Sequence, residues 1–302
     1  MSGTARAPSG PWGRLKSVPL DPLESIGLLS KGDKRLLECK FQEHYYNTIV
    51  ARYLRFCASS GGGDHLEQQF ASLSLVQEHQ SAHNPSRPSD TVDVGVGVGV
   101  SAADGKEREL GVIMAAMRKL REGIVASKRV DEFAVQVYFF CIRAAILVKH
   151  VESYHPALLY LLRTIHLHRA LSPSELQEFG AYLVLDLACR QRDYAQAYEV
   201  RHAHRIHERR TDAIVRAMVH DDYQLFWHIK GNVDGYRAKI MEQAERGMRI
   251  VALKCLGRTY FTVDQAFLTR VTATEWKQLK TDYGVGWELD GEKVIIRKPK
   301  AH

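Results

Sequence analysis

Apolar side chains recur three and four positions apart along most of the chain, which is the spacing of one face of an α-helix. This spacing predicts a first helix over residues 31–58, capped by Asp33, and a series of short helices from 106 to 258. In the first helix the shared face consists of Phe41, Tyr45, Ile49 and Tyr53. The longest later stripe consists of Phe133, Val137, Phe140, Ala144, Leu147 and Val151. The pattern therefore indicates a helical protein.

Capping signals divide the region 106–258 into individual helices. Ser172-Pro173-Ser174-Glu175 has the form of a capping box with proline at the first helical position. Asp193 precedes a further helix, Asp221 a short one, and Asp234 a long one that runs to residue 258. The long helix is predicted to bury Ile240, Ala244, Met248, Val251 and Cys255. Two short helices in roughly every forty residues predict stacked helical hairpins, a solenoid-like array, although no exact repeat is visible.

The pattern changes after residue 258. A β-rich stretch at 259–262 and a short helix are followed by a second capping box, Thr272 to Glu275. The helix that it opens, with Trp276, Leu279 and Tyr283 on one face, ends at Gly284. Asp290-Gly291 is a two-residue turn signal. The hairpin pairs expected from it are Leu289 with Glu292, Glu288 with Lys293, and Trp287 with Val294.

This alternation predicts a half-buried ribbon with Trp287 as a buried anchor and Ile295 as the apolar exception on the outer face. The predicted fold is all-α, with stacked helical hairpins that end in a winged-helix module with a small β-wing. We expect a flexible N-terminal arm at 1–30, the first helix at 31–58, a helical-repeat domain at 106–258 and the winged helix at 259–300. The Gly-, Ser- and Pro-rich stretch 59–105 predicts a disordered insertion, since its regular Gly-Val alternation lacks the strand and helix that flank a phosphate-binding loop.

Composition narrows the class of protein. Of the 302 residues 45% are apolar and 25% charged, which argues against a disordered or fibrous chain. The formal net charge of +7 permits an anionic partner such as nucleic acid without requiring one. The five cysteines form no CxxC pair, which disfavours a disulfide framework, and Cys141, Cys189 and Cys255 are expected to be buried thiols. Without a secretory signal or a membrane-length apolar run, we expect the nucleus, the cytoplasm or both, and no membrane partner.

Signals of catalysis are absent from the sequence. It contains no GxSxG, HExxH or Walker motif, so we expect no enzyme, no cofactor and no small-molecule substrate. The densest histidine cluster is Arg201 to His207. His204 and His207 are three residues apart, but a third ligand at suitable spacing is missing, so no metal site is expected. A solvated helix face is the first interpretation of this cluster, and a face that contacts a polyanion is the second.

Several stretches together carry a resemblance to a known family. They are residues 131–138, 221–227, 249–260 and 286–296, in the order helical repeats, long helix, winged helix. Over about 106–300 the chain resembles the PCI-domain family, the scaffold subunits of the proteasome lid, the signalosome and initiation factor 3, and GANP-type proteins of mRNA export. Lid and signalosome members usually continue past the wing into a long helix, whereas GANP-type relatives can end there. With Lys298-Pro299-Lys300-Ala301-His302 as the last residues, the GANP-type role is the first expectation.

The resemblance implies a non-catalytic scaffold that binds another PCI-type protein and RNA or DNA through a basic winged helix. The residues expected to contact nucleic acid are Lys277, Lys280, Lys293, Arg297 and Lys298. Those expected at a protein partner are Trp227, Glu288 and Ile295. A subunit of the lid, the signalosome or initiation factor 3 is one alternative, and a nucleic-acid-binding module that works alone is another. For the five cations a purely solvated basic face also stays open, and so does a wing that pairs edge-to-edge with a partner's wing.

Overall fold

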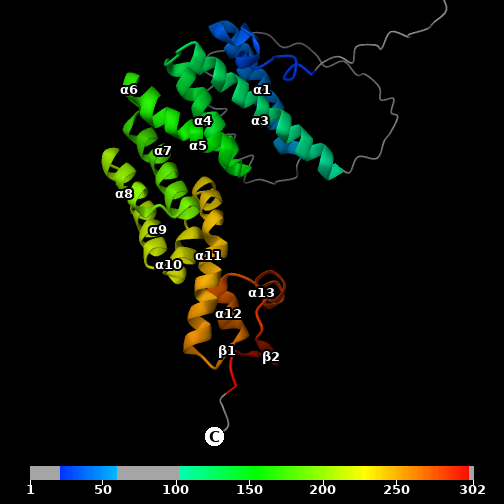
Figure 1. The fold of residues 1–302 in the computed structure, drawn as a ribbon, viewed down its shortest axis with the longest axis vertical. Helices are drawn as coiled ribbons and strands as arrows, with labels where there is room; N and C mark the ends of the chain where they lie inside the picture. The colour runs from blue at the N-terminus through cyan, green and yellow to red at the C-terminus, as the bar shows by residue number, and fades with distance from the viewer. Residues whose placement is uncertain (1–20, 60–101, 299–302) are drawn as a thin grey trace, which may run out of the picture. The chain divides into compact units, whose positions relative to one another are not determined.

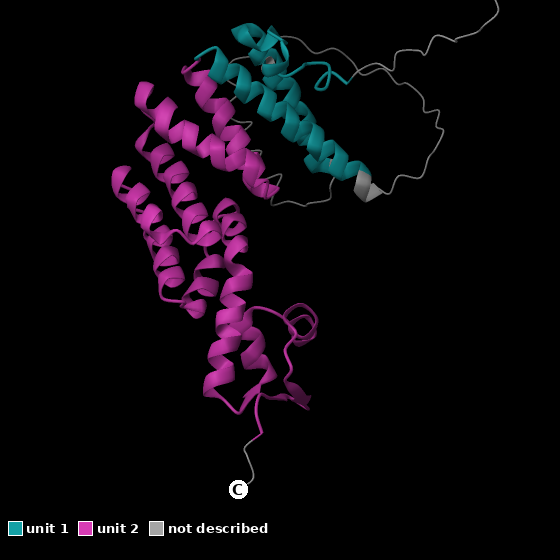
Figure 2. Cartoon of the chain, in the orientation of Figure 1, with its two compact units in different colours: residues 1–128 teal, residues 129–302 magenta. Residues whose placement is uncertain are grey.

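The computed structural model describes residues 21–59 and 102–298. Most of the expected N-terminal arm and insertion lies outside the described residues. The chain divides into two compact units, residues 1–128 and 129–302, which Figure 2 shows in different colours. No helix in the described ranges is long and apolar enough to cross a membrane.

Two long helices form the described part of the first unit. They are α1 (Cys39–Ser59) and α3 (Ala102–Ala126), and two 3₁₀ turns, η1 (Leu29–Lys31) and η2 (Arg35–Leu37), precede α1. Three of the four residues predicted to share a face of α1 are buried, and Phe41 is half-buried. The prediction of Asp33 as the cap is wrong. Its carboxylate accepts hydrogen bonds from the Gly27 and Arg35 amides and from the Arg35 guanidinium, so it closes a turn and α1 begins later.

The second unit holds the remaining helices, which pack as consecutive pairs (Figure 1). Two helices, those that begin as α5 and α7, continue into a turn of π-helix, η3 and η4 respectively. The elements are α4 (Glu132–Leu147), α5 (Val151–Tyr160), η3 (Leu161–Ile165), α6 (His166–His168), α7 (Pro173–Leu185), η4 (Asp186–Gln191), α8 (Tyr194–Ala203), α9 (Arg209–Val219), α10 (Tyr223–Lys230) and α11 (Gly235–Thr259). This arrangement confirms the predicted stacked hairpins.

Most of the predicted caps are confirmed. Ser172 and Glu175 form a complete capping box at α7, Asp193 accepts a hydrogen bond from the Gln196 amide, and Asp234 caps α11. The cap of α10 is Asp222 rather than Asp221. Asp221 instead has a left-handed backbone with φ of 55°, so the helix cannot begin before the residue that follows it.

The buried face of the long helix α11 shifts gradually around the helix axis along its length. Ile240, Ala244 and Met248 are buried as predicted, but farther along the buried residues are Ala252 and Leu256. Cys255 is exposed, so its prediction as a buried thiol is wrong, whereas Cys141 and Cys189 are buried. The buried face shifts around the helix because the C-terminal part of α11 packs on the terminal module. The rest of α11 packs on helices α4 to α10, which we call the repeat helices.

The terminal module has the element order of a winged helix. After α11 come β1 (Thr262–Asp264), α12 (Gln265–Thr272), α13 (Trp276–Tyr283), β2 (Glu288–Asp290) and β3 (Lys293–Ile295), and the antiparallel sheet has the order β1-β3-β2. Its core consists of Ala252, Leu256, Val263, Leu268, Val271, Leu279 and Val294. The predicted fold class is thereby confirmed.

Two local predictions in this module are wrong. Thr272 ends α12 instead of opening a capping box, since its hydroxyl donates to the Leu268 carbonyl and Ala273 takes a left-handed conformation. In the hairpin, Leu289 pairs with Val294 and the turn residues are Gly291 and Glu292. Gly291 has φ of 58° and is the first residue of the turn, the position that favours glycine in a type II′ hairpin turn. The register differs by two residues from the prediction, so each side chain keeps its predicted face.

Candidate nucleic-acid and partner interface

Helix α13 carries two of the predicted nucleic-acid contacts on its outer side. Leu279 is buried in the module's core, while Lys277 and Lys280 are exposed. The Lys280 ammonium lies 5.7 Å from the Trp276 ring centre and donates to the Trp287 carbonyl at 3.2 Å. Neither ammonium has a carboxylate within 4 Å among the described residues. Both charges are therefore available to an anion.

The outer face of the sheet differs from the predicted basic wing. Lys293 lies in the middle strand between Asp264 and Asp290, and Ile295 lies between Thr262 and Glu288. Because residues paired across neighbouring strands share a face, this face carries three carboxylates and one ammonium. The Lys298 ammonium, next to the sheet, lies 3.0 Å from the Glu288 carboxylate. Lys293 and Lys298 thus have acidic neighbours that lower their attraction for phosphate.

The fifth predicted cation, Arg297, is held at the start of the sheet. Its amide donates to the Phe261 carbonyl at 3.1 Å, and its guanidinium donates to the Arg258 carbonyl at 3.0 Å. The guanidinium carbon also lies 5.1 Å from the centre of the Phe261 ring. The five predicted cations therefore occupy three settings: α13, the acidic sheet face with its edge, and the segment between α11 and β1.

That segment contains residues that the sequence pattern did not single out. Tyr260 is 45% exposed and Phe261 55% exposed. The Tyr260 ring lies edge-to-face with Phe267 of α12, with centres 6.2 Å apart, and the Arg270 guanidinium lies 5.5 Å from the Phe267 ring. We call Tyr260, Phe261 and Phe267 the aromatic step. The aromatic pair directly after a helix was the available signal, but burial of both rings is the usual expectation for such a pair.

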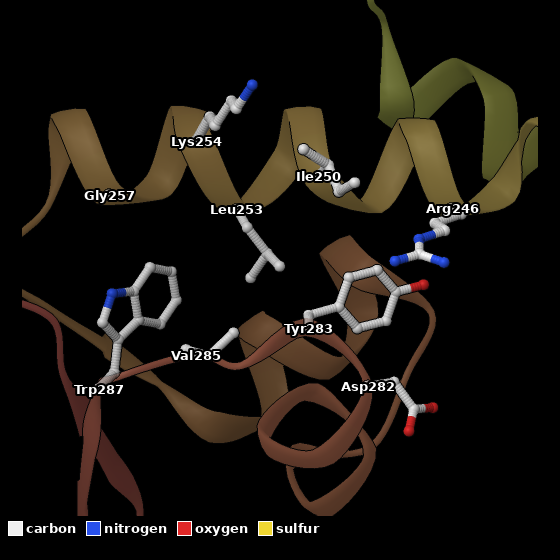
Figure 3. A pocket seen from close by; sticks show the side chains of 9 residues that line it. All are labelled: Arg246, Ile250, Leu253, Lys254, Gly257, Asp282, Tyr283, Val285 and Trp287. Carbon is white, nitrogen blue, oxygen red and sulfur yellow. The ribbon is translucent and has the colours of Figure 1, made fainter.

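A groove of about 400 Å³ separates α11 from the segment that joins α13 to β2 (Figure 3). In Figure 3 Leu253 points from α11 into the space between Trp287 and Tyr283, while Arg246 and Asp282 lie at one end. Trp287, predicted as a buried anchor, packs against the core of the terminal module but is not completely buried. It is half-buried, and its indole packs toward Gly257, where an added Cβ would be 3.6 Å away. The hairpin alternation could not show this, because the groove leaves one side of the indole open.

Trp227, a predicted partner contact, packs within the chain. Its ring lies 5.0 Å from Phe226, and the Arg249 guanidinium lies 4.9 Å from its centre. Arg249 in turn donates to the Thr272 carbonyl and to Glu245, so it links α11 to the terminal module. The indole nitrogen is buried with no hydrogen-bond partner among the described residues. Trp227 thus contributes to the contact of α10 with α11, while the other two predicted partner residues, Glu288 and Ile295, face outward side by side.

A buried cluster of titratable side chains lies in the repeat helices. The Asp186 carboxylate is fully buried and accepts hydrogen bonds from Tyr154 at 2.6 Å and from Arg190 at 2.7 and 2.6 Å, with the His155 ring nitrogen 2.9 Å away. Burial alone would raise the pKa of Asp186, but the bonds from Arg190 and Tyr154 outweigh it and hold the pKa below its usual range. Each oxygen is already occupied, so the cluster stabilises the fold and offers no open site.

The histidine cluster holds no metal ligand set. His204 packs edge-to-face on His166 with ring centres 6.1 Å apart. Burial, together with the neighbouring His166 and Arg163, lowers the pKa of His204. Across residues 21–59 and 102–298 no group of three His, Cys, Asp or Glu side chains is placed to hold a metal ion.

Comparison with known proteins gives no family. No protein-family model matches the chain, and no curated protein matches it. The resemblance to the PCI-domain family therefore stays a prediction, based on the residues quoted for it and on the order of the elements.

Proposed function

We propose that the protein is a non-catalytic scaffold of the PCI type, which joins another PCI-type protein and RNA or DNA through its terminal module, with a GANP-like role in mRNA processing or export. The observation that carries the proposal is the exposure of β2, one of the two edge strands of the module's sheet. All three residues of β2 are exposed, and Leu289 is 40% exposed although it shares a face with the buried Val294.

An exposed edge strand is a place for a second chain to pair. Within the residues that the structure describes, no strand lies beside the outward backbone groups of β2, and a partner's strand would satisfy them and cover Leu289. The groove lined by Ile250, Leu253 and Trp287 lies in the same module and adds apolar surface for the partner. Glu288 and Ile295, paired across β2 and β3, would then lie at the rim of the contact.

The test is affinity purification of Leu289→Asp with mass spectrometry of what co-purifies. The matched control is Leu54→Asp, because the side chain of Leu54 on α1 is 37% exposed, a fraction similar to that of Leu289. We expect wild type and the control to retain a near-stoichiometric PCI-type partner and Leu289→Asp to lose it. A wild-type chain that runs as a monomer with no such partner contradicts the scaffold role. Recovery of a whole lid, signalosome or initiation factor 3 complex would favour the alternative function as its subunit.

The nucleic-acid part of the proposal rests on α13. In winged helices the second helix after the first strand contacts the nucleic-acid backbone, and here it carries Lys277 and Lys280, which have no carboxylate partner in the described part of the chain. Binding through phosphates is sequence-tolerant and depends steeply on salt, with roughly 0.7–0.9 added to the slope of log K against log salt for each contact.

The test compares two double variants with the same change of net charge. Lys277→Glu with Lys280→Glu alters α13, while Lys34→Glu with Lys40→Glu alters exposed lysines of the first unit. We expect only the α13 variant to flatten the salt dependence in titrations of single-stranded RNA and duplex DNA at several salt concentrations. No binding by wild type at low salt, or equal effects of the two variants, would remove the nucleic-acid part.

A further inference from the structure

We infer that the aromatic step binds single-stranded nucleic acid by stacking of its bases on Tyr260 and Phe261. This inference rests on the nucleic-acid part of the proposed function and specifies which form of nucleic acid is bound and where. The first observation is exposure. Among the described residues the only exposed large aromatic side chains are Tyr198, Tyr260 and Phe261, and the last two are consecutive.

The second observation is the arrangement of charge around the rings. The Arg297 guanidinium lies 5.1 Å from the Phe261 ring, and Arg270 lies 5.5 Å from the Phe267 ring that contacts Tyr260. Arg258, the third arginine, offers its carbonyl to Arg297. In the part of the chain that the structure describes, none of these three guanidinium groups has a carboxylate within 4 Å. Exposed rings beside unpaired cations are the combination that binds bases and phosphates of a single strand together.

The third observation sets the direction of the strand's approach. The outer face of the sheet beside the step carries Asp264, Glu288 and Asp290, which repel phosphate. Arg258 lies in the last turn of α11 just before the step, Arg270 lies on α12 and Arg297 lies beside Phe261, so a phosphate backbone would follow these arginines instead. A duplex keeps its bases stacked inside, so it cannot place them on Tyr260 or Phe261 and gains only the charge contacts.

The experiment uses the full chain and three fluorescein-labelled probes in anisotropy titrations: twelve-residue oligothymidylate, an abasic strand of the same length, and a hairpin duplex. We expect Tyr260→Ala and Phe261→Ala each to weaken oligothymidylate binding roughly 5- to 100-fold, the loss of one stacked base. Abasic and duplex binding should stay unchanged, and so should the salt dependence, because the arginines remain. Tyr198→Ala, which removes an exposed ring on α8, is the control and should have no effect.

Two conservative variants separate stacking from apolar burial. Phe261→Trp should retain binding, whereas Phe261→Leu should lose it, because leucine has no ring face. If wild type binds oligothymidylate and the abasic strand equally and Phe261→Ala changes neither, the inference is wrong while the proposed function stands. The inference is also wrong if a glutamate-rich peptide binds wild type and loses affinity equally in the aromatic variants, since the step would then be a protein contact. Failure of wild type to bind any probe at low salt contradicts the proposed nucleic-acid function itself.

Discussion

The repeat helices and the terminal module differ in the ion pairs that they hold inside the fold. In the repeat helices some guanidinium groups are paired inside the fold, as Arg143 is with Glu178 and Arg190 is with the buried Asp186. In the terminal module Arg258, Arg270 and Lys277 are exposed, and among the described residues none of them pairs with a carboxylate.

The difference shows that a net charge of +7 does not locate a binding surface. Paired, partly buried charges fix how helices stack, and removal of one partner leaves the other without compensation. Unpaired, exposed charges contribute little to stability and remain available to an outside anion. Mutation of the two regions should therefore separate folding from binding.

The largest expected effect is in the repeat helices. Asp186→Ala removes the acceptor shared by Tyr154 and Arg190, and we expect it to lower the free energy of unfolding by about 3–5 kcal/mol. Urea titration at neutral pH measures this. The control is Asp212→Ala, whose pair with Arg201 is more exposed and should cost within about 1 kcal/mol. Equal losses for the two variants would contradict the difference that we draw between buried, paired charges and exposed ones.

The next effect lies in the core of the terminal module. Leu279→Ala should cost about 2–5 kcal/mol, because Leu279 is fully buried. Trp287→Ala should cost only about 1–2 kcal/mol, since part of its side chain already lines the open groove. Thermal unfolding of the two variants gives the order. A larger loss for Trp287→Ala would mean that the groove is closed in solution.

The same Asp186 cluster predicts a dependence on pH. The folded pKa of Asp186 lies below its ordinary value of 3.8, so its contribution to stability is present above that value and is lost as the pH falls through the folded pKa. Wild type should therefore lose stability more steeply than Asp186→Asn as the pH falls below about 4. Parallel curves for the two proteins between pH 7 and pH 2.5 would show that the carboxylate does not titrate with a lowered pKa.

The smallest effect is a difference in thiol reactivity that needs no mutation. Burial raises the pKa of the Cys189 thiol in the repeat helices to about 12, whereas Cys255 near the end of α11 is exposed. Because the thiolate is the reactive form, a disulfide reagent should modify Cys255 in the native protein and reach Cys189 only after unfolding. Peptide mass spectrometry after timed labelling identifies the sites. Early modification of Cys189 would mean that η4 opens readily.

The sequence was a good guide to several helix ends at which both partners of an interaction are close along the chain. Ser172 with Glu175, Asp193, and Gly284 at the end of α13 are local signals, and each is confirmed. Asp33 failed as a cap because its carboxylate turns back to Gly27, and Thr272 failed because α12 continues to it. Local residue types do not reveal such competing uses.

The candidate site was harder to predict, because exposure depends on contacts between distant segments. Cys255 lies on a predicted stripe, yet the terminal module covers a different side of α11. Tyr260 and Phe261 look like core residues in the sequence, and only the fold shows them on the surface. The acidic face around Lys293 likewise required the pairing of β1 with β3, two strands that are far apart in the sequence.

Helix α11 has a mechanical consequence. It is one uninterrupted helix of 25 residues, about 37 Å long, which packs against η4, α4 and α7 of the repeat helices and contributes Leu256 to the core of the terminal module. A force on the terminal module would therefore be transmitted to the repeat helices through one continuous helix. Docking of a partner on the terminal module would therefore also fix the orientation of the repeat helices relative to that partner, because both parts of the second unit would move together.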